Sequence, residues 1–438
     1  MHAPSWTALL AAAVLAASCG WPSRHASLAE LPTELVPMEG FEDVRAVDGY
    51  PDAAFQASFD AAIAQLAASP VPADGRRDFD MLVLSSGGVN GSFGAGILTA
   101  WSQRGDRPTF ETVTGVSVGA LMAPFAFAGP AFDHRLEQLF RHINPGDLHR
   151  EKGVLTSVLW DESLADNRPL RRLVARGVDD ELMRAIAKGH AEGRRLYVGS
   201  TNMDIGQFCI WDLGAIATRG TDEARDLLCD VLVASASIPV VYPPMRFEVG
   251  GRDELHSDGA VTRPLFMPQN VFDGYLSAER AGVSWDDIDA TLYVVHNGSL
   301  RACPTDVQRD TLAIATRTVT MMSYTMVSEH ILHLYLLARA WGAEFRFHTL
   351  PGGQELPIDS FTSADTNRLF LLGQGLMERN EPWLQAPPGY VVNEDLHRVQ
   401  PHSTPAAVVD ERGLSERLTV IEEQLRLLRE ELRAAREQ

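Results

Sequence analysis

The sequence predicts an α/β fold built on a mainly parallel central sheet. Two observations support this prediction. Short apolar segments typical of buried strands alternate with stretches long enough for helices. Two of these strand candidates also run directly into glycine-rich turns. The strand candidates are residues Phe79–Leu84, Glu111–Thr114, Leu196–Ser200, Leu292–His296 and Glu344–Thr349.

The composition is that of an acidic globular protein. Apolar residues make up 45% of the 438 residues, which is enough to fill a core. The chain has 38 Lys and Arg against 58 Asp and Glu, a net charge of -20. Such a surface repels phosphate polymers, so we expect no nucleic-acid partner. It is also repelled by an anionic membrane, so contact with a membrane must depend on something other than charge.

The N-terminus resembles a bacterial export signal. Leu9–Ala17 is an apolar run too short to span a bilayer but suited to the central region of a signal peptide. Ser18-Cys19-Gly20 follows and resembles a lipobox, in which the cysteine is lipidated after cleavage. We therefore expect residues 1–25 to direct export to the cell envelope, with a lipid anchor at Cys19. The alternative is a buried or frayed helix with an inert cysteine.

Residues 26–75 form an acidic linker with one predicted helix. A helix that begins after Pro51-Asp52 would carry one apolar face and pack on the main domain. The residues of that face are Phe55, Phe59, Ile63 and Leu66.

Beyond the main domain, predicted for residues 76–385, the chain has a linker at 386–412 and a tail at 413–438. Apolar residues recur in the tail at alternating spacings of four and three, which is a heptad seam and favours a short coiled coil. They are Leu414, Leu418, Ile421, Leu425, Leu428, Leu432 and Ala435. We expect homo-oligomers through this tail. The alternative is an amphipathic helix docked on its own domain.

The cysteines and histidines show no pattern that predicts a metal or a cofactor. None of the four cysteines forms a CxxC pair, and the 13 histidines include no HExxH. After Cys19, the remaining cysteines are Cys209, Cys229 and Cys303. At most one disulfide can form among these three, and we expect three buried free thiols.

The first candidate for catalysis is Gly115-Val116-Ser117-Val118-Gly119, a GxSxG motif between the strand Glu111–Thr114 and an apolar helical run from Ala120. A serine on a tight strand-to-helix turn exposes its hydroxyl, and flanking glycines let the turn form without Cβ clashes. The helix N-terminus behind it favours developing negative charge. This pattern predicts a nucleophilic serine.

A glycine-rich loop, Ser86-Gly87-Gly88-Val89-Asn90-Gly91, follows the strand Phe79–Leu84. It lacks both the GxGxxG of dinucleotide sites and the GK[ST] of a P-loop. Two adjacent glycines instead leave backbone N–H groups free to face an oxyanion. The alternative is a glycine turn that serves only close packing.

The third element is Asp258-Gly259-Ala260, which alone is only a turn. Together, the glycine loop, the GxSxG and this Asp-Gly resemble patatin-like phospholipases over about residues 78–350. So do Thr201–Gly206 and Ala234–Pro239. The resemblance implies helices on both faces of the sheet and a Ser–Asp dyad. The implied roles are Ser117 as nucleophile, Asp258 as general base, Gly87 and Gly88 as oxyanion hole, and Gly91, Gly115, Gly119 and Gly259 as supporting motif positions.

The activity implied is hydrolysis of a lipid or fatty-acyl ester through an acyl-enzyme, without a metal or cofactor. An aspartate at its ordinary pKa of about 3.9 is a poor base for a serine, so we expect partial burial to raise its basicity. Three positions depart from the family: Ser86 and Ala260 replace common glycines, and Asn90 replaces a common basic residue. We expect Ser86 still to offer its backbone N–H to the oxyanion.

Two other functions remain open. One is a Ser-Asp-His triad, in which His296 at a strand end would be the base, with His330 and His348 as further candidates. The other is a non-enzymatic envelope scaffold with an inactive hydrolase domain. The apolar helical stretch Met321–Trp341 could line an acyl-chain cleft, although a packed core helix is the commoner meaning of such a stripe.

Overall fold

The structure of the protein is a computed structural model. All but one of the residues that it describes lie in one compact unit, Met1–Pro387. The described residues are 35–72, 75–143, 150–151, 165–356, 361–380 and 382–388. The predicted signal peptide, Cys19 and the heptad tail lie outside them, as does the linker after residue 388.

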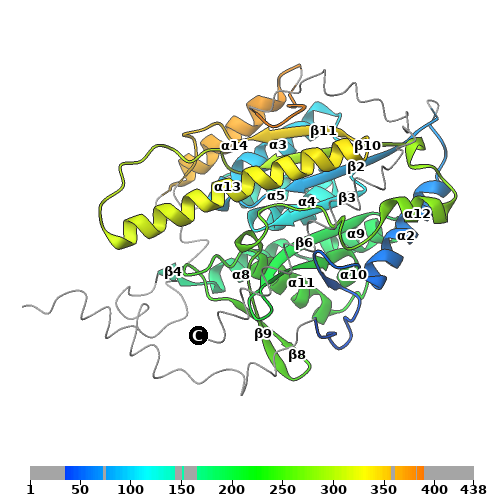
Figure 1. Ribbon diagram of the computed structural model, residues 1–438, viewed down its shortest axis with the longest axis horizontal. Helices are drawn as coiled ribbons and strands as arrows, with labels where there is room; N and C mark the ends of the chain where they lie inside the picture. The colour runs from blue at the N-terminus through cyan, green and yellow to red at the C-terminus, as the bar shows by residue number, and fades with distance from the viewer. Residues whose placement is uncertain are drawn as a thin grey trace, which may run out of the picture. The chain divides into compact units, whose positions relative to one another are not determined.

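Five parallel strands form the centre of the sheet (Figure 1), which confirms the predicted α/β class. In spatial order they are β6 (Arg195–Asn202), β3 (Thr112–Val116), β2 (Arg77–Leu84), β10 (Ile288–His296) and β11 (Glu344–Thr349). Each overlaps one of the five predicted strands, and only β3 begins later than predicted, one residue after Glu111. Along β2, Leu82 and Leu84 join one apolar cluster while Met81 and Val83 join another. A strand buried on both faces therefore has a continuous apolar sequence.

Antiparallel strands extend the sheet beyond β6, and the sequence did not predict them. They are β1 (Arg45–Val47), β7 (Gln207–Asp212), β8 (Met245–Val249) and β9 (Arg252–Asp258). Strand β7 pairs with β6 and β1, whereas β9 pairs with β8 and with the end of β6. The last residue of β9, Asp258, thereby lies opposite Ser200 of β6. A separate two-stranded pair consists of β4 (Arg150–Glu151) and β5 (Ala165–Asp166).

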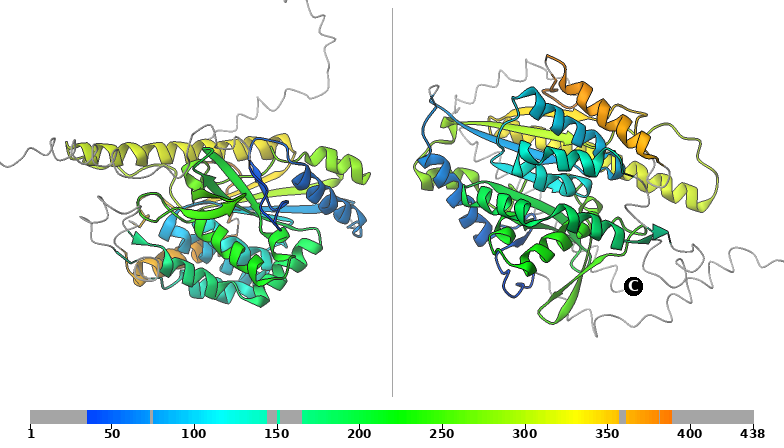
Figure 2. Two further views of the ribbon diagram at one scale, coloured as in Figure 1. Left: turned by 90° about the horizontal axis from the view of Figure 1, so that it is seen from below. Right: turned by 180° about the vertical axis from the view of Figure 1, so that it is seen from behind.

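Helices cover both faces of the sheet, as the family resemblance implied (Figure 2). One apolar cluster includes residues of α3 (Gly91–Arg104), α4 (Val118–Ala128), α5 (Asp133–Phe140), α8 (Arg168–Gly177), α9 (Asp180–Ala191), α10 (Leu213–Ala217), α11 (Asp222–Ser235) and α14 (Ser363–Met377). The other includes residues of α2 (Ala53–Ala68), α12 (Gly274–Ala281) and α13 (Thr311–Ala340). Short 3-10 turns lie at Gly88–Asn90, Pro130–Phe132, Gly259–Val261 and Trp285–Asp287.

Helix α2 confirms the prediction made from its apolar face. Asp52 caps its N-terminus by accepting hydrogen bonds from the backbone N–H groups of Ala54 and Phe55. Phe59 stacks on Phe272, with ring centroids 3.9 Å apart. The acidic N-terminal region therefore ends in a helix that packs on the main domain.

The three described cysteines are all free, but the prediction that all three are buried was wrong. Cys209 and Cys229 are buried, and Cys303 is exposed. Cys303 lies in the loop between β10 and α13. Within the described part of the chain, no helix is both long and apolar enough to cross a membrane. The same residues contain no cluster of side chains suited to a metal ion.

Candidate active site

Ser117 lies on a sharp turn between β3 and α4. Its φ of 55° and ψ of -123° are a conformation that side-chain-bearing residues rarely adopt. The two glycines of the motif make room for this turn. A Cβ at Gly119 would lie 2.2 Å from the carbonyl oxygen of Leu84, and one at Gly115 would lie 2.5 Å from the carbonyl oxygen of Gly119. The GxSxG spacing is therefore required by close backbone approach on both sides of the serine.

A second serine holds this turn in place. The backbone N–H of Ser117 donates to Ser235 Oγ at 2.9 Å, and the Ser235 hydroxyl donates to the carbonyl oxygen of Gly199 at 2.6 Å. Ser235 is fully buried at the end of α11. It links the turn to strand β6. The sequence pattern Ala234–Pro239 contained this residue without indicating its contact.

The hydroxyl of Ser117 donates a hydrogen bond to Asp258 Oδ2 at 2.5 Å. The other carboxylate oxygen, Oδ1, accepts from the backbone N–H of Ala260 at 2.8 Å. Both side chains are only 3% exposed. Burial raises the pKa of Asp258 to about 7, although the hydrogen bonds from Ser117 and Ala260 act in the opposite direction. The structure thus brings the predicted nucleophile and base together, and burial makes the carboxylate a far better base near neutral pH.

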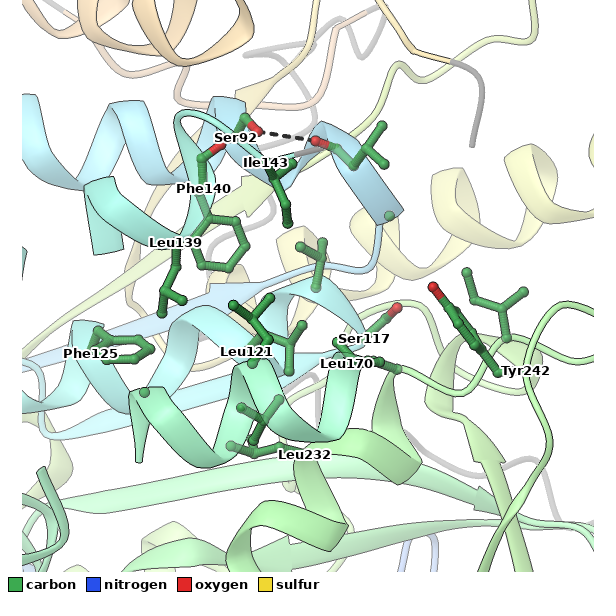
Figure 3. Close-up of a pocket in the computed structure, with 18 of the residues that line it drawn as sticks. Ser92, Ser117, Leu121, Phe125, Leu139, Phe140, Ile143, Leu170, Leu232 and Tyr242 are labelled. Carbon is green, nitrogen blue, oxygen red and sulfur yellow. Dashed lines mark hydrogen bonds between the residues drawn. The ribbon is translucent and has the colours of Figure 1, made fainter. Parts of the chain in front are cut away.

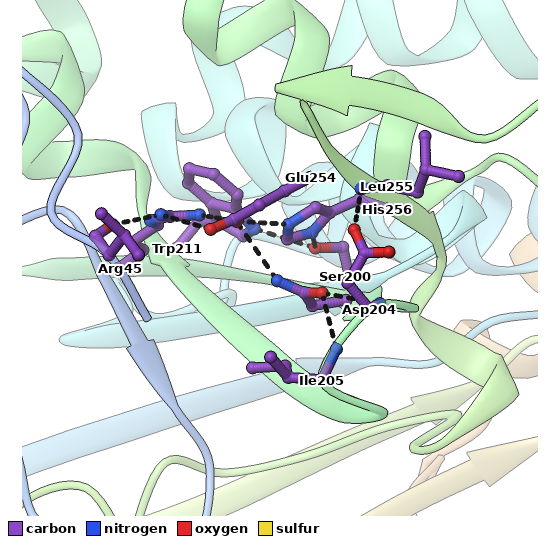
Figure 4. Close-up of polar contacts among 10 residues, drawn as sticks. Arg45, Ser200, Asp204, Ile205, Trp211, Glu254, Leu255 and His256 are labelled. Atoms are coloured by element: carbon purple, nitrogen blue, oxygen red, sulfur yellow. Dashed lines mark hydrogen bonds and ion pairs between the residues drawn. The ribbon is translucent and has the colours of Figure 1, made fainter. Parts of the chain in front are cut away.

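A polar network fixes the strand that carries Asp258 (Figure 4). Glu254 on β9 forms an ion pair of 2.6 Å with Arg45 of β1 and accepts a hydrogen bond from Asn202. His256, two residues before Asp258, contacts Ser200 Oγ through Nδ1 at 2.9 Å. Burial lowers the pKa of His256, because desolvation disfavours the charged form of the ring. The register of β9 against β6 therefore depends on buried polar contacts, and so does the position of Asp258.

The glycine loop passes close to Ser117. Gly88, with a φ of 56°, lines the same cleft as Ser117, and a Cβ at Gly87 would lie 2.0 Å from the carbonyl oxygen of Asn297. Within the described residues, the backbone N–H groups of Gly87 and Gly88 donate no hydrogen bond. By contrast, the N–H of Ser86 donates to the carbonyl oxygen of Pro264 at 2.8 Å, so the expectation that Ser86 faces an oxyanion was wrong.

Asn90 has a structural contact at the position where the family commonly has a basic residue. Its side-chain oxygen accepts a hydrogen bond from the backbone N–H of Leu356 at 2.8 Å. The side chain is buried and belongs to the start of α3. An amide at this position therefore holds a neighbouring loop.

The three histidines considered for a triad do not contact Asp258. His296 lies at the end of β10, where Nδ1 contacts Ser85 Oγ at 2.9 Å and Nε2 contacts the carbonyl oxygen of Ser299 at 3.4 Å. Burial lowers its pKa to about 4. His330 contacts the carbonyl oxygen of Met326, and His348 packs on Trp383. The geometry therefore favours a Ser–Asp pair over a triad.

An apolar cleft begins at Ser117 and runs along one side of α4 (Figure 3). Its volume is about 80 Å³. Helix α4 contributes Val118, Leu121 and Phe125, whose spacing places them on one face. Further lining comes from α5 and α8, which include Leu139, Phe140, Leu170, Leu173, Val174 and Gly177. The sequence did not predict this cleft, because its walls come from segments far apart in the chain.

Helix α13, which contains the stretch Met321–Trp341 except its last residue, does not line this cleft. Its buried residues belong to the cluster on the opposite face of the sheet from α4. Val327, Ile331, Leu334 and Ala338 are among them. The interpretation as a packed core helix therefore holds for its second half.

A serine on a strand-to-helix turn, hydrogen-bonded to a buried carboxylate, resembles the nucleophile site of serine hydrolases. Residues 82–269 match the family model of the patatin-like phospholipases. This part of the chain is therefore a domain of the patatin-like phospholipase family, a family of lipid acyl hydrolases. It includes Ser117, Asp258 and the glycine loop.

Among solved structures, the chain is similar to VipD from Legionella pneumophila. The sequence identity is 11% and the TM-score is 0.27, over 68% of this chain and 66% of that chain. Among curated proteins, none matches this sequence.

Proposed function

We propose that the protein is a serine lipid acyl hydrolase that acts through a Ser–Asp dyad. The observation that carries this proposal is the 2.5 Å hydrogen bond between Ser117 Oγ and Asp258 Oδ2 at the start of an apolar cleft. In the first step, Ser117 Oγ attacks the ester carbonyl carbon while Asp258 takes the hydroxyl proton. The backbone N–H groups of Gly87 and Gly88 stabilise the resulting oxyanion.

The intermediate then collapses, and the alcohol leaves with the proton that Asp258 had taken. A water molecule attacks the acyl-enzyme in the second half of the reaction, and Asp258 again accepts a proton. When the fatty acid departs, the Ser117 oxygen takes from Asp258 the proton that the water molecule gave up. A carboxylate with a pKa near 7 suits both directions of transfer.

An active-site fluorophosphonate provides the direct test of the proposed nucleophile. We expect the probe to label the wild-type chain and not Ser117→Ala, because only an activated serine hydroxyl displaces fluoride. Mass spectrometry of the tryptic peptide that contains residue 117 reads the result. If the folded wild-type protein takes no label, the alternative of a non-enzymatic scaffold replaces this proposal.

The cleft indicates that the acyl chain lies along α4, ending near Gly177. Eight residues of helix separate Ser117 from Phe125, a rise of roughly 12 Å. At Gly177, a Cβ would lie 3.3 Å from Phe125 Cζ and 3.4 Å from Leu139 Cδ1. A larger side chain there would therefore occupy the far end of the cleft.

Gly177→Leu is expected to shift the preference of the enzyme toward shorter acyl chains. The ratio of kcat/KM for a long-chain to a short-chain 4-nitrophenyl ester should fall by about tenfold, because the leucine side chain displaces the terminal methylenes. Gly375→Leu is the matched control, since Gly375 is also helical and a Cβ there meets nothing within 4 Å. An unchanged ratio in Gly177→Leu would place the acyl chain elsewhere.

We further propose export of the chain to a cell envelope, with residues 1–25 as signal peptide and Cys19 as lipidation site. The support is the apolar run and small residues before Cys19. Metabolic labelling with a fatty acid should mark the wild type, and equal labelling of Cys19→Ala would contradict the anchor.

We also propose self-association through residues 413–438. Light scattering of a chain that ends at residue 412 should then give fewer subunits per particle than the full chain. An unchanged number of subunits would contradict the coiled coil.

A further inference from the structure

The first half of helix α13 extends beyond the body of the protein. Among the side chains of this helix that the structure describes, the buried ones lie in its second half, from Val327 onward. None of its described side chains before that residue is buried. Sixteen residues, 311–326, correspond to about 24 Å of helix. Figure 1 shows this half of α13 running out past the ends of the neighbouring strands.

The polarity of this half is reversed with respect to the usual surface helix. Its half-buried side is partly polar. Arg317 donates to the carbonyl oxygen of Cys303 in the preceding loop at 3.0 Å, and the Tyr324 hydroxyl donates to Glu355, which follows β11, at 2.8 Å. The opposite side faces solvent and carries large apolar residues. They are Ile314, Val319, Met321 and Met322, exposed by 53%, 63%, 53% and 65%. A helix that meets only water would normally place its apolar residues inward.

Four hydroxyl groups of this half are already hydrogen-bonded within the helix. Each donates to the carbonyl oxygen four residues earlier, at distances of 2.8 to 3.1 Å. The residues are Thr318, Thr320, Ser323 and Thr325. A hydroxyl that is satisfied in this way costs little to move from water into an apolar medium. These four hydroxyl groups therefore do not oppose the burial of this half of the helix in lipid.

The charge of this segment selects the kind of surface. Arg317 is the one charged residue between 311 and 328, in a chain with a net charge of -20. An anionic surface would repel the protein and find no cluster of cations here. A zwitterionic lipid surface, with no net charge, matches an uncharged apolar stripe on an acidic protein.

The overhanging half lies at the edge of the sheet that carries Ser117. Strands β3 and β10 run parallel within one sheet, so their carboxyl ends share an edge. Ser117 follows the end of β3, and α13 begins after the end of β10 and returns along the sheet toward β11. Its free half therefore extends from the same edge at which the proposed reaction takes place.

We propose that the exposed stripe of α13, Ile314, Val319, Met321 and Met322, docks on a zwitterionic phospholipid surface. The helix lies along the interface with these side chains among the acyl chains, and it brings the Ser117 edge to the lipid. The purpose of this contact rests on the proposed function, but the contact itself requires no catalysis. Docking and hydrolysis can therefore be tested separately.

The test is flotation of the full chain with phosphatidylcholine vesicles. Every sample carries Ser117→Ala, so that lipid is not consumed, and Cys19→Ser, so that no acyl anchor contributes. We expect Met322→Glu to weaken vesicle binding by roughly tenfold, because a carboxylate replaces a lipid-facing side chain. Leu336→Glu is the matched control. It adds the same charge to an exposed position in the second half of the same helix, and binding should change by less than about twofold.

Three results would overturn the docking surface. The parent here is the chain that carries Ser117→Ala and Cys19→Ser alone. The first result is equal vesicle binding by Met322→Glu and this parent, and the second is no vesicle binding by the parent. The third is a parent dimer that Met322→Glu converts to a monomer without any effect on vesicles, which would assign the stripe to a second copy. With Ser117 restored, hydrolysis of a soluble short-chain ester by Met322→Glu should equal that of the wild type. If the wild type binds vesicles but hydrolyses no ester, the proposed function is contradicted and the docking surface is still supported.

Discussion

Asp258→Asn is expected to lower kcat/KM for a soluble ester by about 10²–10⁴-fold, whereas His296→Asn keeps it within a few-fold of the wild type. The asparagine can still accept a hydrogen bond from Ser117, but it cannot take the proton. His296 already contacts Ser85 and Ser299, and neither contact leads to the nucleophile. Steady-state kinetics of the two variants provide the measurement. A loss at His296 with activity kept at Asp258 would contradict the Ser–Asp dyad.

The pKa of Asp258 adds a pH dependence with a defined sign. Activity needs the ionised carboxylate, so kcat/KM should rise with pH through about 7 and then level off. Stability changes in the opposite direction. The folded-state pKa of about 7 lies above the unfolded value near 3.8, so the protonated carboxyl is the form that folding favours. Its contribution is fully present below about pH 4 and is lost as the pH rises through 7.

Asparagine does not ionise, so Asp258→Asn should gain stability over the wild type across this pH range. A difference of about three pKa units corresponds to a gain on the order of 4 kcal/mol at pH 8. Urea unfolding of both proteins at pH 4.5 and pH 8 measures the difference. The expected outcome is an inactive variant that is more stable than the wild type at pH 8. A variant that is less stable at both pH values would contradict the destabilisation of the fold by the buried Asp258 carboxylate.

Gly87→Ala is expected to lower kcat by about 10²–10³-fold, the usual effect of losing an oxyanion donor. The added Cβ would lie 2.0 Å from a backbone oxygen of Asn297, so the loop must move away from its position beside the nucleophile. Overpacking of this kind also costs about 1–3 kcal/mol of stability. Kinetics at a temperature well below the measured Tm separate the two effects.

Gly105→Ala is the matched control for this loop. Gly105 also has a positive φ, 89°, but a Cβ there meets nothing within 4 Å. The control should lose a little stability through its backbone conformation and keep its kcat. If Gly87→Ala unfolds at a lower temperature but retains full kcat, the loop serves packing and not the oxyanion.

The sequence by itself determined the parallel part of the fold and the chemistry that the chain can offer. Buried parallel strands have continuous apolar sequences, and the five predicted strands all lie in the sheet. The GxSxG turn was recognisable because its glycines are required where backbone segments approach closely at the turn. The helix start at Asp52 was recognisable because a cap acts within one helical turn. Such signals lie within a few residues of one another, so they can be recognised in a linear sequence.

Only the tertiary structure decided how these parts act together. Asp258 reaches Ser117 because antiparallel β9 pairs with β6, an arrangement set by contacts such as Arg45 with Glu254 across 209 residues. Ser235, the cleft beside α4 and the pKa of Asp258 all depend on burial by distant segments. The backbone N–H of Ser86 and the exposure of Cys303 were misjudged for the same reason. Desolvation and hydrogen-bond partners are properties of packed neighbours, and packing brings together residues whose distance in the chain no local pattern records.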